Sequence, residues 1–161
     1  RQSVIADRTL FRIGSISKTF TWTAVMQLVQ AGKIKLNADV NDYLDFKVPE
    51  KDGGPLTMRD LLTQTPGFED TARDEFLASP SKLFPLGNYV KKDMPTRIFP
   101  PGKIVAYSNY GATLAGYIVQ RVSGQPFDQY VEEHIFKPLG MDHSTFVQPL
   151  PEAWNPYMSV G

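Results

Sequence analysis

The chain contains several stretches in which apolar residues recur at helical spacing, and each stretch has a start or stop signal. Residues 15–31 are apolar on nearly every face and end at Gly32, a common residue just after a helix, which predicts a central, largely buried helix. Residues 56–64 predict a short helix, and Thr57 is suited to cap its N-terminus. A third helix is predicted over residues 86–93.

Two further helices are predicted in the second half of the chain. Ser108 can cap a long helix over residues 110–122, which a Ser-Gly pair then closes. Pro126 occupies a first-turn position and opens an amphipathic helix that extends to about His134.

Strand signals are weak by comparison. Only residues 4–5 and 104–106 look like strands, and both stretches are short. No repeat, low-complexity tract, charge run or linker composition divides the sequence. The pattern therefore predicts a mainly α-helical chain with little or no sheet, in which residues 1–161 form a single α-rich unit.

Composition and charge argue against several classes of function. The chain has 161 residues and 42% hydrophobic content, which suits one domain around one core. Its 17 Lys and Arg balance its 17 Asp and Glu, so no net field would hold a polyanion, and we expect no nucleic-acid partner. The longest stretches without charge are shorter than the ~20 apolar residues that a membrane span requires.

The absence of cysteine and the scarcity of histidine narrow the candidate chemistry. Without Cys the chain has no thiolate metal site, disulfide or cysteine nucleophile. Two His cannot make a three-His metal site, and they leave only two candidate bases for a Ser-His-Asp triad. We expect His134, on the same predicted face as Phe127 and Tyr130, to be a partly buried structural residue, and His143 to lie in a turn.

A serine and a lysine three residues apart begin the predicted central helix. Ser15 and Lys18 would share one helix face, where a neutral Lys can act as a base toward the Ser hydroxyl. The helix N-terminus adds partial positive charge where an oxyanion would develop. The spacing alone is weak evidence, because Ser79 and Lys82 repeat it, and Pro80 between them favours a turn in which that pair is structural.

A tyrosine and an asparagine flank the serine that caps the long helix. Tyr107 can relay protons if a nearby ammonium favours its anion, and the Asn109 amide can fix a Lys side chain and bind a substrate carbonyl. The same residues also fit a capped helix start with a packed Tyr. The spacing alone leaves both interpretations open.

Four segments of the chain resemble, in order, the serine β-lactamase and penicillin-binding-protein superfamily, specifically its class C β-lactamase-like branch. Residues 11–21 resemble the segment that carries the nucleophile in an S-x-x-K motif. Residues 56–68 resemble the helix and turn that follow, residues 100–111 the second motif, and residues 135–141 a later segment. This order over nearly the whole chain is far more specific than either short motif. A Tyr at the start of the second motif resembles the class C, esterase and D-aminopeptidase side of the superfamily.

The resemblance implies a role for each candidate residue. Ser15 would be the acylated nucleophile, Lys18 its activating partner and Tyr107 the proton relay. Asn109 would contact both the substrate and the Lys side chain. The implied reaction is acyl transfer through an acyl-enzyme, and the implied partner is a small-molecule or peptide substrate: a β-lactam, a D-alanyl peptide or an ester. The resemblance implies no metal or organic cofactor, and a periplasmic, cell-envelope or secreted location.

Parts of the family pattern are absent from the sequence. The third motif, Lys-Thr-Gly or His-x-Gly on a sheet strand, does not follow the second motif, and the opening strands expected ahead of Phe11 are missing. We therefore expect the helical region of a fold that is an α/β sandwich when complete, excised from a longer chain at Arg1, with the flanking sheet-forming segments as its partners. Gln64 stands where relatives often carry His, and Pro66 where they often carry Ser; we expect both to have low functional weight.

Three functions remain open from the sequence. The first is a serine hydrolase, of which this fragment would be weakly active or inactive, because losing one oxyanion-hole donor lowers a rate by ~10²–10³. The second is a penicillin-binding sensor or binding module that acylates without turnover. The third is a catalytically silent scaffold, against which the presence of all four candidate residues argues.

Overall fold

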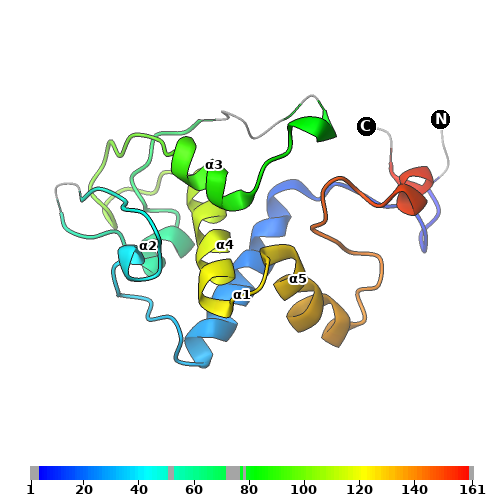
Figure 1. Ribbon diagram of the computed structural model, residues 1–161, viewed down its shortest axis with the longest axis horizontal. Helices are drawn as coiled ribbons and strands as arrows, with labels where there is room; N and C mark the ends of the chain where they lie inside the picture. The colour runs from blue at the N-terminus through cyan, green and yellow to red at the C-terminus, as the bar shows by residue number, and fades with distance from the viewer. Residues whose placement is uncertain (1–3, 51–52, 72–76, 78, 160–161) are drawn as a thin grey trace.

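Five α-helices occur among the described residues, and they confirm the expectation of a mainly helical chain (Figure 1). The computed structural model describes residues 4–50, 53–71, 77 and 79–159. The helices are α1 (Lys18–Gln30), α2 (Met58–Leu62), α3 (Leu86–Lys92), α4 (Asn109–Ser123) and α5 (Phe127–Val131).

Shorter helical turns connect these helices and extend their ends. One π-helical turn, Glu132–Phe136, directly continues α5. The 3-10 turns are Gly14–Ser17, Val40–Asp42, Pro80–Lys82, Lys137–Leu139 and Glu152–Tyr157.

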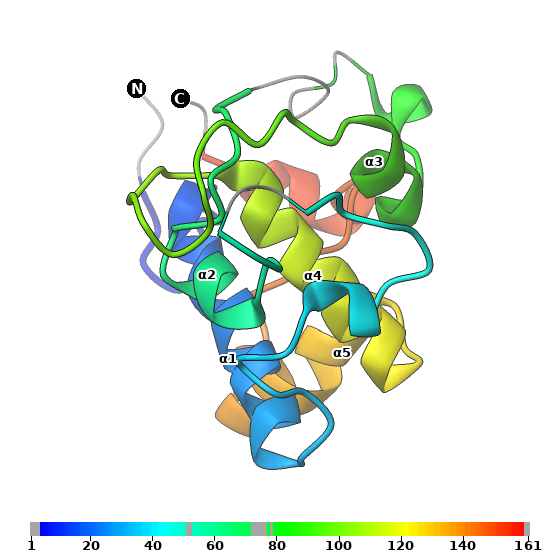
Figure 2. The same cartoon turned by 90° about the vertical axis from the view of Figure 1, so that its left-hand side faces the viewer.

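Helix α4 lies at the centre of the other helices. It packs against α1, α2, α3 and α5, as the two views of the ribbon show (Figures 1 and 2). Nine of its 15 residues are buried, and small residues among them let neighbours approach closely. A Cβ at Gly111 would lie 3.4 Å from Pro66, and one at Gly116 would lie 3.5 Å from the Phe127 ring. The hydrophobic core therefore forms around α4, which the other four helices contact.

The predicted capping signals are present at the ends of α2 and α4. The Ser108 hydroxyl accepts a hydrogen bond from the Gly111 N–H at 3.0 Å, and Gly124 ends α4 in the left-handed conformation with φ 76°. Thr57 and Asp60 form a capping box at the start of α2, in which each side chain accepts from the other residue's N–H. These helices therefore begin where the sequence predicts.

Helix α1 is less buried than its sequence predicts. Its buried residues are Thr21, Ala24, Val25 and Leu28, which follow one face, whereas the Met26 side chain is 44% exposed. The prediction of a largely buried central helix was therefore wrong for α1, because α4 occupies the centre and covers only one side of it.

The fifth helix continues past its predicted end through the π-helical turn. The wider turn lets Ile135 and Phe136 both become buried, at 3% exposure each. His134 lies on the outer side of this turn and is exposed, with its ring 4.4 Å from that of Tyr130 and its Nε2 3.2 Å from the Gln125 side chain. The expectation of a partly buried His134 was wrong, because the change of helical register turns this residue outward.

The two predicted strands do not form. Residues 4–5 and 104–106 are irregular, and the described residues contain only isolated bridges, such as the one that joins Leu10 to Met158. This bridge brings the two end segments of the chain together (Figure 1). A short apolar run needs a paired neighbour to become a strand, and the described residues provide none for these two.

A non-helical passage, residues 96–108, lies along the turn that follows α2, residues 64–69. Backbone hydrogen bonds join the two segments at several points: the N–H groups of Ile98 and Phe99 donate to the Gly67 carbonyl at 2.8 and 3.2 Å, and Gly102 donates to Thr65 at 2.9 Å. The passage leads directly into α4. Its position therefore decides where the residues just before α4 lie.

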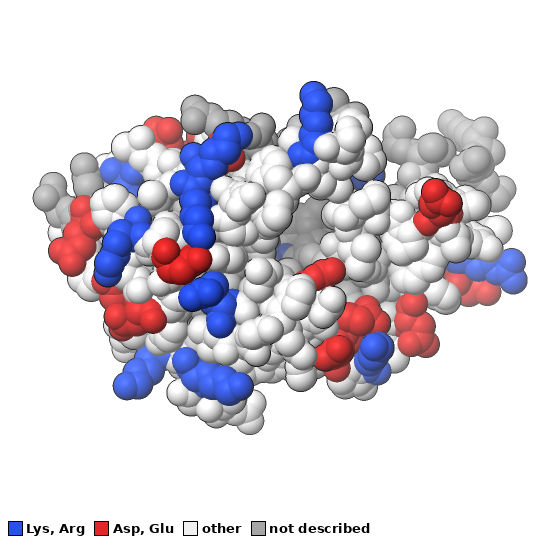
Figure 3. Space-filling model, in the orientation of Figure 1, with Lys and Arg blue, Asp and Glu red and all other residues white. Residues whose placement is uncertain are grey.

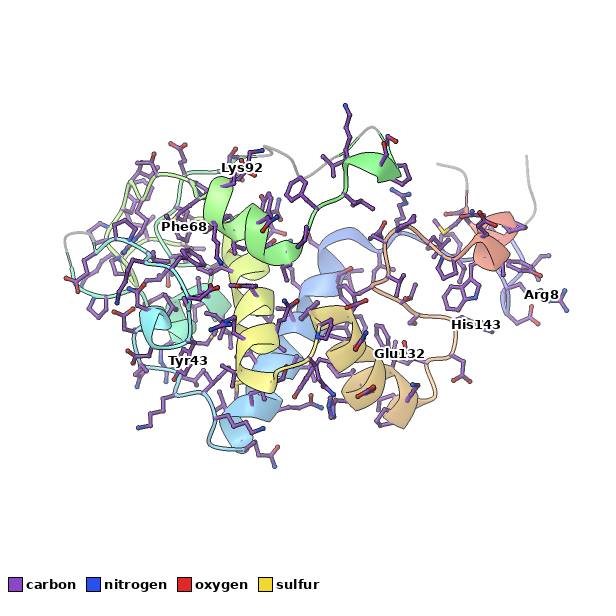
Figure 4. All side chains as sticks on the ribbon, viewed as in Figure 1. Arg8, Tyr43, Phe68, Lys92, Glu132 and His143 are labelled. Atoms are coloured by element: carbon purple, nitrogen blue, oxygen red, sulfur yellow. The ribbon has the colours of Figure 1, made fainter. Side chains whose placement is uncertain are left out.

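The aromatic ring of Phe68, labelled in Figure 4, packs against a residue of α4 and holds the same turn against this helix. The rings of Phe68 and Tyr110 meet edge to face, with centroids 4.9 Å apart. Burial raises the pKa of the Tyr110 phenol, which stays protonated and donates to the Val90 carbonyl in α3 at 2.6 Å. Tyr110 thus links the turn after α2, α4 and α3.

The surface carries charges of both signs. Lys and Arg side chains and Asp and Glu side chains both occur across the face shown in Figure 3, in keeping with the balanced composition. Lys91 of α3 pairs with Asp45 at 2.8 Å, and this hydrogen bond lowers the pKa of the Asp45 carboxyl. Across the described residues, no helix combines the length and apolar character needed to cross a membrane.

We predict that Gly67→Ala destabilises the fold more than the same change at another left-handed glycine. Gly67 has φ 76°, and a Cβ there would lie 2.1 Å from the Phe99 carbonyl oxygen; Gly124 has the same φ but nothing within 4 Å. Denaturant unfolding should show a loss of about 1–2 kcal/mol for Gly124→Ala, and more than about 2 kcal/mol for Gly67→Ala. Equal losses would contradict the close approach of the passage to the turn.

Candidate active site

Ser15 and Lys18 lie where the chain enters α1. Ser15 belongs to the 3-10 turn Gly14–Ser17, and α1 itself begins at Lys18, so the Ser precedes the first α-helical turn instead of lying within it. Side chains three residues apart are eclipsed in a 3-10 turn. The Lys18 Nζ consequently donates to the Ser15 Oγ at 3.1 Å.

Tyr107 and Asn109 lie on either side of the buried cap of α4. Ser108 is 1% exposed and faces inward, Tyr107 is 47% exposed, and Asn109 is the half-buried first residue of α4. The local capping geometry therefore leaves the side chains of Tyr107 and Asn109 to face the start of α1.

The structure brings all four predicted residues together. The Lys18 Nζ donates to the Asn109 Oδ1 at 2.7 Å, although the two residues are 91 positions apart in the sequence. The Tyr107 O–H donates to the Ser15 Oγ at 2.5 Å. The Lys18 ammonium also lies over the Tyr107 ring, 4.8 Å from its centroid. The contact between α1 and α4 thus places their N-terminal ends side by side.

This arrangement has the parts needed for nucleophilic chemistry. The exposed Ser15 hydroxyl is within hydrogen-bond distance of both an amine and a phenol. Groups that can exchange a proton with a hydroxyl at this distance can activate it as a nucleophile. Within the part of the chain that the structure describes, no group of three or more His, Asp or Glu could hold a metal ion.

The second Ser-Lys pair has a different geometry. Ser79 caps the 3-10 turn Pro80–Lys82, and its hydroxyl accepts from the Ser81 N–H at 3.3 Å. The predicted turn at this pair is confirmed. His143 also lies in a turn, as predicted, and its ring is 6.4 Å from that of Trp154 (Figure 4).

The sequence did not predict the contacts of Gln64, which was expected to have low functional weight. The Gln64 side-chain oxygen accepts from the Ser108 N–H at 2.8 Å, and the Gln64 main-chain oxygen accepts from the Ala106 N–H at 2.8 Å. A signal was present in the sequence, since a non-glycine residue follows α2 where a helix commonly ends in Gly. Its partners, however, lie more than 40 residues away and could not be inferred from local pattern.

The sequence matches the β-lactamase family over residues 3–159. The chain therefore belongs to the β-lactamase family.

Individual relatives support this assignment and show how much of a whole protein is present. PbpX of Bacillus subtilis is 32% identical over 155 residues, which cover 95% of this chain and 36% of PbpX. The crystal structure of a penicillin-binding protein from Bacillus halodurans matches with a TM-score of 0.72 at 33% identity, and covers 89% of this chain and 44% of that chain. A D-stereospecific amidohydrolase from Streptomyces matches with a TM-score of 0.69 at 33% identity, over 80% of this chain and 42% of its own. The chain thus spans less than half the length of each of these relatives.

We predict that the cap between Tyr107 and Asn109 contributes measurably to stability. Ser108→Ala removes the oxygen that accepts from the Gly111 N–H, and should lower the free energy of unfolding by about 1–2 kcal/mol in a denaturant titration. Ser79→Ala is the matched control, because it removes the cap of a short surface turn and should cost less than about 0.5 kcal/mol. A Ser108 variant as stable as the control would show that the cap does not hold the start of α4.

Proposed function

We propose that the protein is a serine hydrolase that acts through an acyl-enzyme, with Ser15 as its nucleophile. The observation that carries this proposal is that Ser15 Oγ lies 3.1 Å from the Lys18 amine and 2.5 Å from the Tyr107 phenol. Membership of the β-lactamase family supports the same reaction class. In this proposal Ser15, Lys18 and Tyr107 are catalytic, and Asn109 binds both Lys18 and the substrate.

The short Ser15–Tyr107 contact supplies the path for the proton. In the proposed mechanism Tyr107, a hydrogen-bond donor to Ser15 in the structure, first loses its own proton to solvent; as Ser15 Oγ bonds to the substrate carbonyl carbon, the Ser15 proton then passes to the resulting phenolate. Lys18, held by Asn109, places a positive charge beside that phenolate and favours it. The same proton then leaves on the departing amine or alcohol, the acyl-enzyme remains, and water repeats the sequence to release the acid.

The substrates we propose are β-lactams, D-alanyl peptides or esters. Two relatives that are both 33% identical to the chain, a penicillin-binding protein and a D-stereospecific amidohydrolase, support the first two of these classes. All of these substrates share a carbonyl carbon that a serine hydroxyl can attack. The four residues of the candidate site do not identify which of these substrates is used, because one catalytic centre can act on several acyl donors.

We also propose that the chain is the helical part of a longer enzyme, as its coverage of 36% of PbpX suggests. The absent third motif would supply part of the oxyanion hole and one wall of the substrate groove. The 161-residue chain should therefore hydrolyse a chromogenic cephalosporin or a nitrophenyl ester at least ~100-fold more slowly than the longer natural protein. Equal specific activities would refute the proposal that an essential segment lies outside the chain.

Replacement of Ser15 tests the proposed reaction directly in the full-length protein. Ser15→Ala should abolish covalent labelling by a fluorescent penicillin and lower ester or cephalosporin hydrolysis by at least ~10³-fold. Ser79→Ala, in the second Ser-Lys pair, is the matched control and should leave both readouts unchanged.

The outcomes separate the possible functions. Hydrolysis that survives Ser15→Ala would contradict the nucleophile assignment. A persistent adduct on Ser15 without turnover would replace the hydrolase proposal by a penicillin-binding sensor or binding module. Absence of both labelling and hydrolysis in the unmodified protein would indicate a silent scaffold.

A further inference from the structure

Gln64 occupies a backbone conformation that glycine normally takes. It follows the C-terminal end of α2, where its N–H donates to the Leu61 carbonyl at 3.2 Å and the next N–H, of Thr65, donates to the Asp60 carbonyl at 2.8 Å. These two bonds form a Schellman motif, whose left-handed residue is usually Gly. Gln64 has φ 57° and is the single non-glycine residue with positive φ in the described ranges. A residue strained in this way persists where its surroundings fix it, and such residues cluster at functional sites.

The contacts of Gln64 bracket one residue, Tyr107. On one side the Ala106 N–H donates to the Gln64 main-chain oxygen at 2.8 Å, and on the other side the Ser108 N–H donates to the Gln64 Oε1 at 2.8 Å. A glycine at this position would relieve the strain and keep the first bond. Only a side chain of this length with an acceptor oxygen supplies the second bond.

The backbone on either side of Tyr107 helps to decide where its phenol lies. It precedes α4 in an irregular segment, and its side chain is 47% exposed, so that packing surrounds only half of it. With the backbone fixed on both sides, two side-chain torsions decide where the phenol oxygen lies. That oxygen must stay 2.5 Å from Ser15 Oγ for direct proton transfer. Misplacement of a reacting group by ~1 Å can lower a rate by ~10²-fold.

We propose that Gln64 is the positioning residue for Tyr107, and that its side-chain bond to the Ser108 N–H keeps the phenol against Ser15. This inference rests on the proposed function, because the position of Tyr107 limits the rate only if Tyr107 carries the proton. It also replaces the expectation that Gln64 has low functional weight.

The first test measures acylation by a penicillin in the full-length protein. Gln64→Leu and Gln64→Gly both remove the acceptor oxygen, and each should lower the acylation rate by about 10- to 100-fold. Because binding is not the step affected, the dissociation constant of the noncovalent penicillin complex, obtained from the dependence of the acylation rate on penicillin concentration, should change by less than about threefold. Gln64→Glu keeps an acceptor oxygen at the same position and should recover most of the rate. Equal losses for Glu, Leu and Gly would overturn the proposal.

Two comparisons guard against a general loss of structure. The Gly variant suits φ 57°, so it carries the test if the Leu variant does not fold; a folded Gly variant with the wild-type rate would overturn the inference. Gln120→Leu is the matched control, since the Gln120 Oε1 also accepts a backbone N–H, that of Phe127 at 3.4 Å, toward the other end of α4. It should change the acylation rate by less than about twofold.

A double-mutant cycle separates this inference from the proposed function. If Gln64 acts through Tyr107, then Gln64→Leu should cause no further loss in a Tyr107→Phe background. Additive losses in the double variant would overturn the positioning role while leaving the hydrolase intact. A Tyr107→Phe variant with full activity would overturn the proton-relay role of Tyr107, and the positioning role with it.

Discussion

Packing of α4 against α1 is the constraint on which the site depends. Small and apolar residues of α4 are buried on several sides, so close packing constrains the position of α4 relative to its neighbours. At the end of this apolar contact, Lys18 and Asn109 form a polar link 2.7 Å long. The burial of the helices fixes their relative position, and the link uses that position to join residues 91 apart in sequence.

A different kind of interaction holds the remaining member of the site. Tyr107 lies before α4 in a passage that is joined to the turn after α2 chiefly by backbone hydrogen bonds. Gly67 allows the close approach of the two segments, and Gln64 forms the last two bonds of the series. The site therefore combines two helix ends placed by the apolar core with one loop residue placed by main-chain pairing.

Local signals in the sequence predicted most of the helices. The caps Thr57 and Ser108 and the terminal Gly124 act within a few residues of themselves, and the helices begin and end at or near these positions. The errors arose where tertiary packing decides the outcome. Helix α1 is buried on one face only, and the π-helical turn after α5 turns His134 outward, because neighbouring elements decide which faces are covered.

The site could be predicted in part. The three-residue spacing of Ser15 and Lys18 indicates proximity, whereas the spacing of Tyr107, Ser108 and Asn109 predicted the cap but left the roles of its two neighbours open. That the two pairs meet came from family resemblance, because no local rule relates residues 92 positions apart. The role proposed for Gln64 could not be predicted from the sequence for the same reason, because its partners lie in a passage that only the tertiary fold places beside it.

The most direct test is a crystal structure of the full-length protein after reaction with a penicillin. The account predicts an acyl group on Ser15 Oγ, with the Lys18 amine and the Tyr107 oxygen still within about 3.2 Å of that atom. It also predicts that Lys18 remains bonded to Asn109. An acyl group on another residue, or a side chain from outside this chain in the place of Tyr107, would contradict it.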